Sequence, residues 1–187
     1  MRRTDSGKRT RLVEAAVGVV HEQGFHRTTL ADIARRAEVP LGNVYYYFRT
    51  KEDLGQALIE EQAARQAALR RQWEARKDPR AEIDSFVSMT LENRDALARS
   101  GCPVGTLCGE LGKHGGPLAQ SAGSVLADIL DWLTERFDAL GTDEDPRQLA
   151  VHLLSALQGA SLLAHGFADP ALVEGEARRL RGWLATL

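Results

Sequence analysis

The chain is poor in the residues that several protein classes need. Its 187 residues contain two cysteines, Cys102 and Cys108, which are too few for a disulfide framework, so a reducing cytoplasm is the expected compartment. Val and Ile number 11 and 4 against 26 Ala and 25 Leu, a bias towards helix formers that excludes an all-β protein. No apolar run approaches the ~20 residues of a membrane span, and no apolar run follows the basic start as it would in a secretory signal.

Enzyme signatures are also absent. The sequence contains no GxSxG, HExxH, P-loop or GxGxxG pattern. We therefore expect no enzymatic activity, no cofactor and no membrane association.

Positive charge is concentrated at the start of the chain. Residues 1–51 carry 10 Lys+Arg and 5 Asp+Glu, a net charge of +5, whereas residues 52–187 carry 14 and 21, a net charge of −7. A basic first quarter favours an N-terminal unit that faces a polyanion such as nucleic acid. An excess of five charges is modest, so chance is the alternative explanation.

Apolar residues recur at helical spacing throughout the chain, and Gly or Pro separates the periodic segments. The pattern predicts an all-α protein of about nine helices, near residues 6–23, 30–37, 41–48, 51–77, 80–99, 104–113, 118–137, 146–165 and 170–184. We expect Thr29 and Thr50 to cap the second and fourth of these helices.

Residues 28–51, TTLADIARRAEVPLGNVYYYFRTK, contain a short amphipathic helix, a tight break and a second short helix. This order is typical of a helix-turn-helix, whose second helix enters the major groove of DNA. Because a helix spreads successive side chains by about 100°, Tyr45, Tyr46 and Tyr47 cannot all be buried, and at least one must face outward. Gly42 would let the backbone approach DNA closely, and Asn43 could bond a base edge or a phosphate.

Residues before the first short helix and after the second are suited to phosphate binding. The residues that can neutralise or hydrogen-bond the DNA backbone beside the groove are Arg27, Thr29, Arg49 and Lys51. Val44, Tyr47 and Phe48 are interpreted instead as members of a small core.

The pairs Gly24-Phe25, Thr28-Thr29 and Ile33-Ala34, together with VPLGNVYYYFRTKE over residues 39–52, resemble the N-terminal signature of the TetR family of transcriptional regulators. The resemblance implies DNA contacts by matching positions, namely Thr29, Gly42, Asn43, Tyr45, Tyr46 and Lys51. Leu41 differs from the residue type usual at this position of the family, because relatives often carry a polar or basic base-reading residue there. A leucine cannot donate to guanine, but it can contact a thymine methyl group.

The same resemblance implies a DNA-binding domain over residues 1–52 and a ligand-binding and dimerisation domain over residues 53–187. The expected function is a ligand-released repressor that binds a palindromic double-stranded operator as a homodimer, although the sequence is also compatible with an activator. The alternative from another class is a helical bundle that binds small molecules without a DNA function.

The last two helices carry more apolar residues than one buried stripe needs, which favours a dimer interface over a core within one chain. The residues concerned are Leu149, Leu153, Leu154, Leu157, Leu162, Leu163, Leu172, Leu180, Trp183 and Leu184, together with Gly159 and Ala160.

A mixture of apolar and polar residues in the C-terminal part suits a pocket for a small apolar or aromatic effector. The apolar candidates are Phe86, Met89, Ile129, Trp132, Phe137 and Leu162, and the polar candidates are Thr90, Asn93, Gln158, Ser161 and His165. Ordinary core packing is the alternative for each aromatic residue.

The segment containing Cys102 and Cys108 resembles a Gly-Cys-Pro stretch of one TetR subgroup, some of whose members respond to electrophiles or oxidants. Cys102 precedes a helix, whose positive end would lower the pKa of its thiol. The alternative is a pair of buried, inert thiols. The spacing of these two cysteines and His114 does not favour a metal site.

Overall fold

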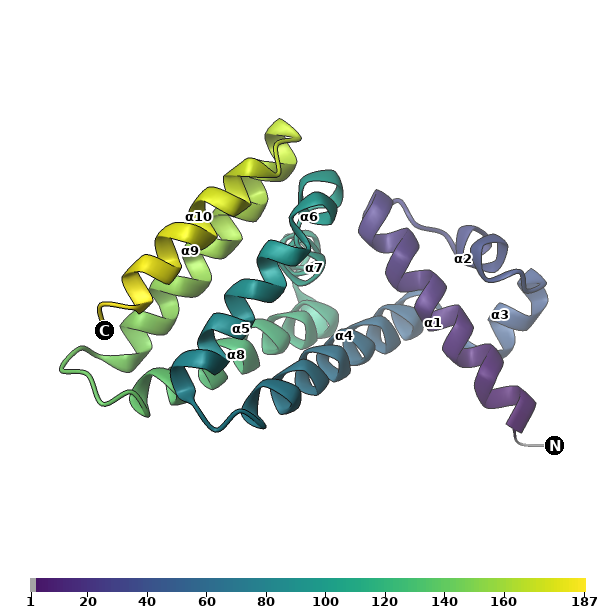
Figure 1. Ribbon diagram of the computed structural model, residues 1–187. Helices are drawn as coiled ribbons and strands as arrows, with labels where there is room; N and C mark the ends of the chain where they lie inside the picture. Colours follow the sequence, from purple (N-terminus) through teal and green to yellow (C-terminus); the bar gives the residue numbers. More distant parts are fainter. Residues whose placement is uncertain (1–2) are drawn as a thin grey trace. The chain divides into compact units, whose positions relative to one another are not determined.

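The computed structural model describes residues 3–187, and side chains from Gly7 onward. The described residues form ten α-helices and no strands, which confirms the all-α class (Figure 1). The helices are α1 (Arg3–Gln23), α2 (Leu30–Ala37), α3 (Leu41–Tyr47), α4 (Lys51–Glu74), α5 (Pro79–Glu92), α6 (Arg94–Ser100), α7 (Pro103–Gly112), α8 (Gly116–Asp138), α9 (Pro146–Phe167) and α10 (Ala171–Leu184).

One expected helix is divided in two. The segment 80–99 consists of α5 and α6, separated at Asn93, whose φ of −91° and ψ of 7° depart from helical geometry. The Asn93 amide donates to the Met89 carbonyl oxygen at 2.7 Å and occupies an acceptor at the end of α5. Asn93 is therefore both the C-cap of α5 and the N-cap of α6, although the apolar spacing continues through this segment.

Several helix starts follow from capping chemistry. The Asp78 side chain accepts from the backbone N–H groups of Arg80 and Ala81, and Asp145 accepts from that of Arg147. A proline follows each of these caps at the first helical position, where its missing N–H costs nothing. These two Asp-Pro pairs therefore mark the starts of α5 and α9, within one residue of the predicted starts at residues 80 and 146.

The chain forms two compact units, Met1–Ala64 with Thr106–Val125, and Arg65–Gly105 with Leu126–Leu187. The first unit thus extends past residue 52, the functional boundary expected from the sequence, and takes in a second segment. Helices α4, α7 and α8 each contribute residues to both units.

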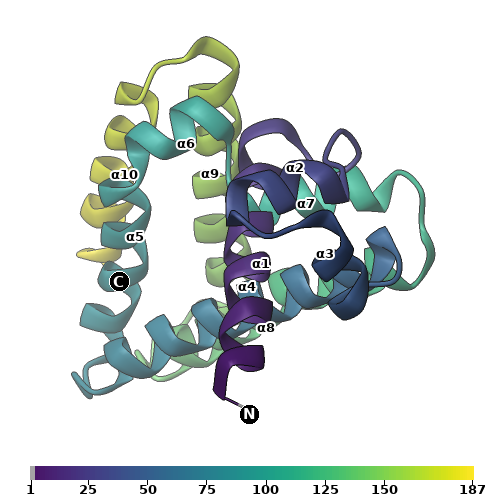
Figure 2. The same cartoon turned by 90° about the vertical axis from the view of Figure 1, so that its right-hand side faces the viewer.

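In the second unit, α9 packs against α6 and α10, and α10 packs against α5 (Figures 1 and 2). Arg181 of α10 joins Asp84 of α5 through Nε at 2.7 Å and also donates to the Ser88 hydroxyl. Helix α9 is long and apolar enough to cross a membrane by length and composition, but 44% of its apolar window is buried inside the protein. A single helix of this kind is weak evidence for a membrane span, because core helices pass the same test.

The turn after α2 contains a left-handed residue. Glu38 has a φ of 55°, and the N–H groups of Glu38 and Val39 bond the carbonyl oxygens of Arg35 and Ala34 at 3.3 and 3.0 Å. Left-handed backbone brings the Cβ of any residue except glycine close to the following carbonyl oxygen. The turn that leads into α3 is therefore built with local strain.

Glycine at position 38 should relieve this strain. We predict that Glu38→Gly raises the free energy of unfolding by roughly 0.5–1 kcal/mol, because the relief exceeds the extra entropy lost on folding. Urea unfolding monitored by circular dichroism measures the change. Glu60→Gly is the control, since it places glycine in the exposed middle of α4 and should lower stability by about 1 kcal/mol. Destabilisation by both variants would contradict the prediction.

Candidate nucleic-acid interface

The first short helix of the helix-turn-helix, α2, starts with a reciprocal cap. The Thr29 hydroxyl accepts from the Asp32 N–H at 3.2 Å and donates to Asp32 Oδ2 at 2.6 Å, while the Thr29 N–H bonds the same oxygen at 3.0 Å. This arrangement confirms Thr29 as the N-cap. The bonds from Thr29 hold the pKa of the Asp32 carboxyl below its ordinary value, because they stabilise the charged form.

The second short helix, α3, is anchored by two buried side chains. Val44 is fully buried and Phe48, directly after the helix, is 2% exposed. At the start of α4, the Thr50 hydroxyl accepts from the Asp53 N–H at 3.0 Å, and the Asp53 carboxylate accepts from the N–H groups of Arg49 and Thr50. Capped helices thus lie before and after α3 in the chain, which fixes where it begins and ends.

The remaining face of α3 is open. Leu41, Tyr45 and Tyr46 are 40%, 52% and 74% exposed. Gly42 is also exposed, and a Cβ built there would meet no atom within 4 Å. Asn43 is half-buried at the edge of this face. The structure thus gathers five of the predicted DNA-binding residues on the helix that the sequence assigned to the groove.

Arg27, Thr29 and Lys51 lie outside α3. Arg27 and Thr29 are exposed in and just after the turn that joins α1 to α2. The Lys51 Nζ atom donates to the His26 carbonyl oxygen at 2.9 Å and lies 4.9 Å from the centroid of the Phe25 ring. Burial lowers the pKa of this ammonium group, although Glu52 and Glu110 oppose the shift. Lys51 therefore holds the turn in place, and its phosphate contact stays a prediction.

The same turn is held by a residue far away in the sequence. The Glu110 carboxylate of α7 accepts from the His26 N–H at 3.3 Å and lies so close to Gly24 that a Cβ there would be 2.7 Å from Oε1. Gly24 has a φ of 85°, a backbone conformation that favours glycine, and a larger residue there would also displace the Glu110 carboxylate. Sequence reasoning missed Glu110, because no local pattern connects it with a turn 84 residues earlier.

Comparisons with known proteins agree with this geometry. Residues 12–58 match the family described as bacterial regulatory proteins, tetR family, and residues 79–173 match the C-terminal domain of LmrA/YxaF-like transcriptional regulators. The transcriptional regulator AcuR of Cereibacter sphaeroides is 31% identical over 165 residues, which cover 82% of this chain and 74% of that protein. The chain belongs to the TetR family.

A solved TetR structure from Rhodobacter sphaeroides superposes on this regulator with a TM-score of 0.82 at 28% identity, covering 92% of this chain and 96% of the other. A helix-turn-helix regulator of Mycobacterium tuberculosis is 28% identical over 186 residues, 95% of this chain and 94% of that protein. This regulator therefore has a helix-turn-helix DNA-binding domain, and its relatives are transcriptional regulators.

The second unit of this TetR-family protein contains the residues expected to bind an effector. Phe86, Ile129, Trp132 and Phe137 belong to one buried cluster, and Met89 packs against it. Leu162 does not join them, because its side chain is 71% exposed on α9. Its role in an effector pocket stays a prediction.

Each of the expected polar residues has a hydrogen-bond contact within the second unit. Thr90, Asn93 and Ser161 each donate to a carbonyl oxygen four residues earlier in the chain. His165 is exposed, with Nδ1 3.3 Å from the Ala98 carbonyl oxygen, and Gln158 donates to the Cys102 sulfur. Their role in orienting an effector stays a prediction.

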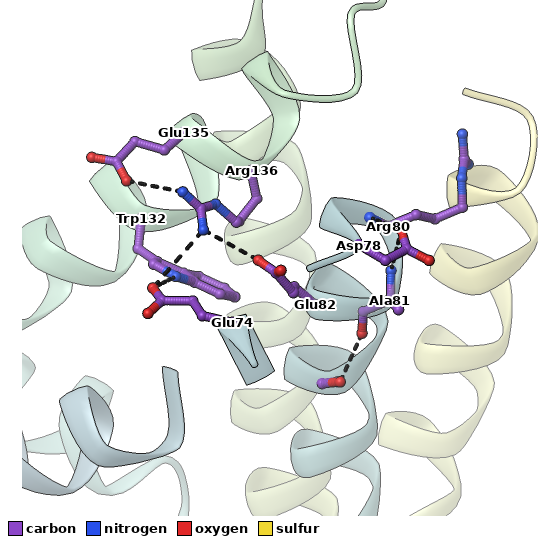
Figure 3. A network of polar contacts seen from close by, with 9 residues as sticks. Glu74, Asp78, Arg80, Ala81, Glu82, Trp132, Glu135 and Arg136 are labelled. Atoms are coloured by element: carbon purple, nitrogen blue, oxygen red, sulfur yellow. Dashed lines mark hydrogen bonds and ion pairs between the residues drawn. The ribbon is translucent and has the colours of Figure 1, made fainter. Parts of the chain in front are cut away.

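The structure adds residues to this core that the sequence analysis did not name. The ring of Trp73, near the end of α4, lies 5.6 Å from that of Trp132 and 6.1 Å from that of Phe86, measured between centroids. Arg136 bonds Glu82, which is 3% exposed, at 3.2 Å, and the Trp132 indole donates to Glu74 at 2.8 Å (Figure 3). This network joins α4, α5 and α8 beside the aromatic cluster.

The two thiols have separate surroundings. The Cys102 sulfur accepts from the Gly105 N–H and the Gln158 amide at 3.4 Å each, directly before α7. The Cys108 thiol donates to the Ala122 carbonyl oxygen at 3.1 Å. Both cysteines are half-buried and form no disulfide with each other, and a role in redox sensing stays a prediction.

The cap of α2 generates a pH-dependent prediction. Because the folded pKa of Asp32 is lowered, its bonds to Thr29 stabilise the protein above the unfolded pKa of about 4, and this contribution is lost as the pH falls. We expect Thr29→Ala to cost about 1 kcal/mol of unfolding free energy at pH 7 and less at pH 3. Urea unfolding at both pH values measures the difference.

Thr29→Ser is the matched control, because it keeps the hydroxyl group and should stay close to wild type at both pH values. An equal cost of Thr29→Ala at pH 7 and pH 3 would show that Asp32 is not linked to the cap.

Proposed function

We propose that this TetR-family regulator binds a palindromic operator as a homodimer and that a small apolar or aromatic effector releases it, so that it acts as a repressor. With DNA as its partner, the cytoplasm is its proposed compartment. The observation that carries the proposal is the open face of α3, where exposed tyrosines surround a glycine that the fold itself does not need.

Gly42 supports DNA binding because nothing inside the protein explains it. A glycine within a helix costs roughly 0.5–1 kcal/mol relative to alanine, and the space around Gly42 would accept a Cβ. Glycine also permits a close approach between its backbone and another molecule. A DNA groove against α3 would use that approach, and Tyr45 and Tyr46 on either flank could donate to phosphates.

The homodimer is supported by an unpartnered face of α9. Leu162, Leu163 and Phe167 are 71%, 51% and 72% exposed, whereas Leu153 and Leu157 on the same helix are buried. Exposed apolar side chains gathered on one helix mark an interaction surface. A second copy of this face would cover it and place two recognition helices on one duplex, as a palindrome requires.

Effector release needs the second unit to influence the first. Helices α4, α7 and α8 run through both units, and Glu110 of α7 holds the turn before α2. An effector in the aromatic core would act by binding the released state better than the operator-bound state. The helices α4, α7 and α8 would transmit the conformational change to the first unit.

Gly42→Ala tests the DNA-binding role separately from folding. We expect its unfolding free energy to rise by up to about 1 kcal/mol, because alanine favours the helix. Its affinity for a palindrome enriched from random duplexes by the wild-type protein should fall about ten-fold, because the added methyl group keeps the backbone from the groove. Urea unfolding and fluorescence anisotropy measure the two effects.

Gly123→Ala is the matched control, since Gly123 is also an exposed helical glycine with open space, but it lies in α8. It should gain stability and keep wild-type affinity. Equal affinities for Gly42→Ala and wild type would contradict the assigned face, and failure to enrich any duplex would contradict operator binding.

Leu162→Glu tests the dimer. Leu162 is exposed in the single chain, so the variant should keep its helical circular dichroism, whereas a charge at Leu157, which is 2% exposed, would disrupt the core. We expect wild type to sediment as a dimer and Leu162→Glu as a monomer at micromolar concentration.

Leu41→Glu serves as the reciprocal control, because it changes an exposed leucine on α3 and should remain dimeric. If the Leu162→Glu protein still sediments as a dimer, the proposal that α9 forms the interface is wrong.

A further inference from the structure

The recognition helix lacks the side chains that usually read guanine. Its sequence, LGNVYYY, contains no Arg or Lys. The commonest specific contact to guanine in the major groove is a bidentate bond from Arg or Lys to O6 and N7. Base selection by α3 must therefore use neutral groups.

The arrangement of α3 places an apolar group at its leading end. At about 100° per residue, Gly42 and Tyr46 lie opposite the buried Val44, and Leu41 and Tyr45 occupy one flank. Residues in the first turn of a recognition helix contact base edges. Leu41 is in that turn and is 40% exposed, whereas the apolar residues Val39 and Val44 beside it in the sequence are buried.

The chemistry of the major groove limits what Leu41 can recognise. Thymine presents its C5-methyl group there, and guanine, adenine and unmodified cytosine present polar acceptors and donors on their edges. Leucine cannot pair with these polar groups, and covering them would leave them without hydrogen-bond partners. An apolar contact between Leu41 and a thymine methyl group avoids that penalty.

The other neutral groups agree with this assignment. Asn43 carries the one side-chain amide of α3, and an amide bonds adenine through N6 and N7. The exposed cations Arg27, Arg35 and Arg49 lie outside α3, where they can neutralise phosphates without reading sequence. In this assignment the residues outside α3 contribute phosphate contacts and affinity, and the residues of α3 select the bases.

We propose that Leu41 reads the C5-methyl group of a thymine in each operator half-site, within a core of A·T pairs. The inference rests on the proposed binding of a palindromic operator and adds the chemical identity of one contacted base. It also implies that 5-methylcytosine, which carries the same methyl group, can replace that thymine in the contact with Leu41.

The experiment removes the methyl group without changing base pairing. A palindrome enriched by the wild-type protein is synthesised with deoxyuridine in place of each thymine in turn, symmetrically in both half-sites. At one position we expect wild-type affinity to fall about four-fold per half-site, the value for burying one methyl group. Leu41→Ala should bind the thymine and deoxyuridine forms with nearly equal affinity.

Tyr46→Phe is the control, because loss of a hydroxyl group should weaken binding and leave the four-fold deoxyuridine effect unchanged. Leu41→Arg, put through the same enrichment, should prefer guanine at the position where wild type prefers thymine.

The outcomes separate this inference from the proposed function. If wild-type protein enriches a palindrome but no deoxyuridine position distinguishes wild type from Leu41→Ala, the role of Leu41 is overturned and operator binding stands. Enrichment of a palindrome with G·C pairs at the α3 contacts would overturn it as well. If no sequence is enriched, the proposed function fails, and the inference fails with it.

Discussion

A helix of seven residues cannot be stable by itself in water, and the DNA-binding unit is organised around that constraint on α3. Nucleating a helical turn fixes several residues for few hydrogen bonds, so isolated helices shorter than ~12–15 residues are marginal. Helix α3 buries Val44 and is followed by the buried Phe48, and capping boxes at Thr29 and Thr50 fix the helices on either side. Because its neighbours hold it from one side, the other side is left free for a ligand.

This division explains why the residues of α3 differ in kind around its axis. The inward position needs an apolar side chain of a given size, whereas the outward positions contribute little to folding. Gly42 and the exposed Tyr46 are tolerated there because the fold does not depend on them. Stability therefore depends on the inward face of this short helix, and the outward face is the one proposed to contact DNA.

Helix α9, which is longer than α3, also has a buried set and an exposed set of residues. Leu153 and Leu157 complete the core of the second unit, while Leu162 and Phe167 remain exposed. Within one chain α9 packs against α6 and α10 and still leaves these two apolar side chains uncovered. The excess apolar residues were visible in the sequence, but their separation into a buried and an exposed set was not.

Local signals in the sequence determined the all-α class, most helix limits and the caps. The predicted span 30–37 coincides with α2, because Thr29, Asp32 and the break at Glu38 act within a few residues of one another. The outward face of α3 was also predictable, since three consecutive tyrosines cannot all be buried. These features depend on chemistry that one or two helical turns contain.

Tertiary structure decided what depends on distant residues. It placed the Lys51 ammonium on the His26 carbonyl oxygen, Glu110 against Gly24, and Leu162 away from the aromatic core. Contacts between residues tens of positions apart leave no periodic pattern in the chain, and the packing of whole helices selects among the many pairings that the same composition allows.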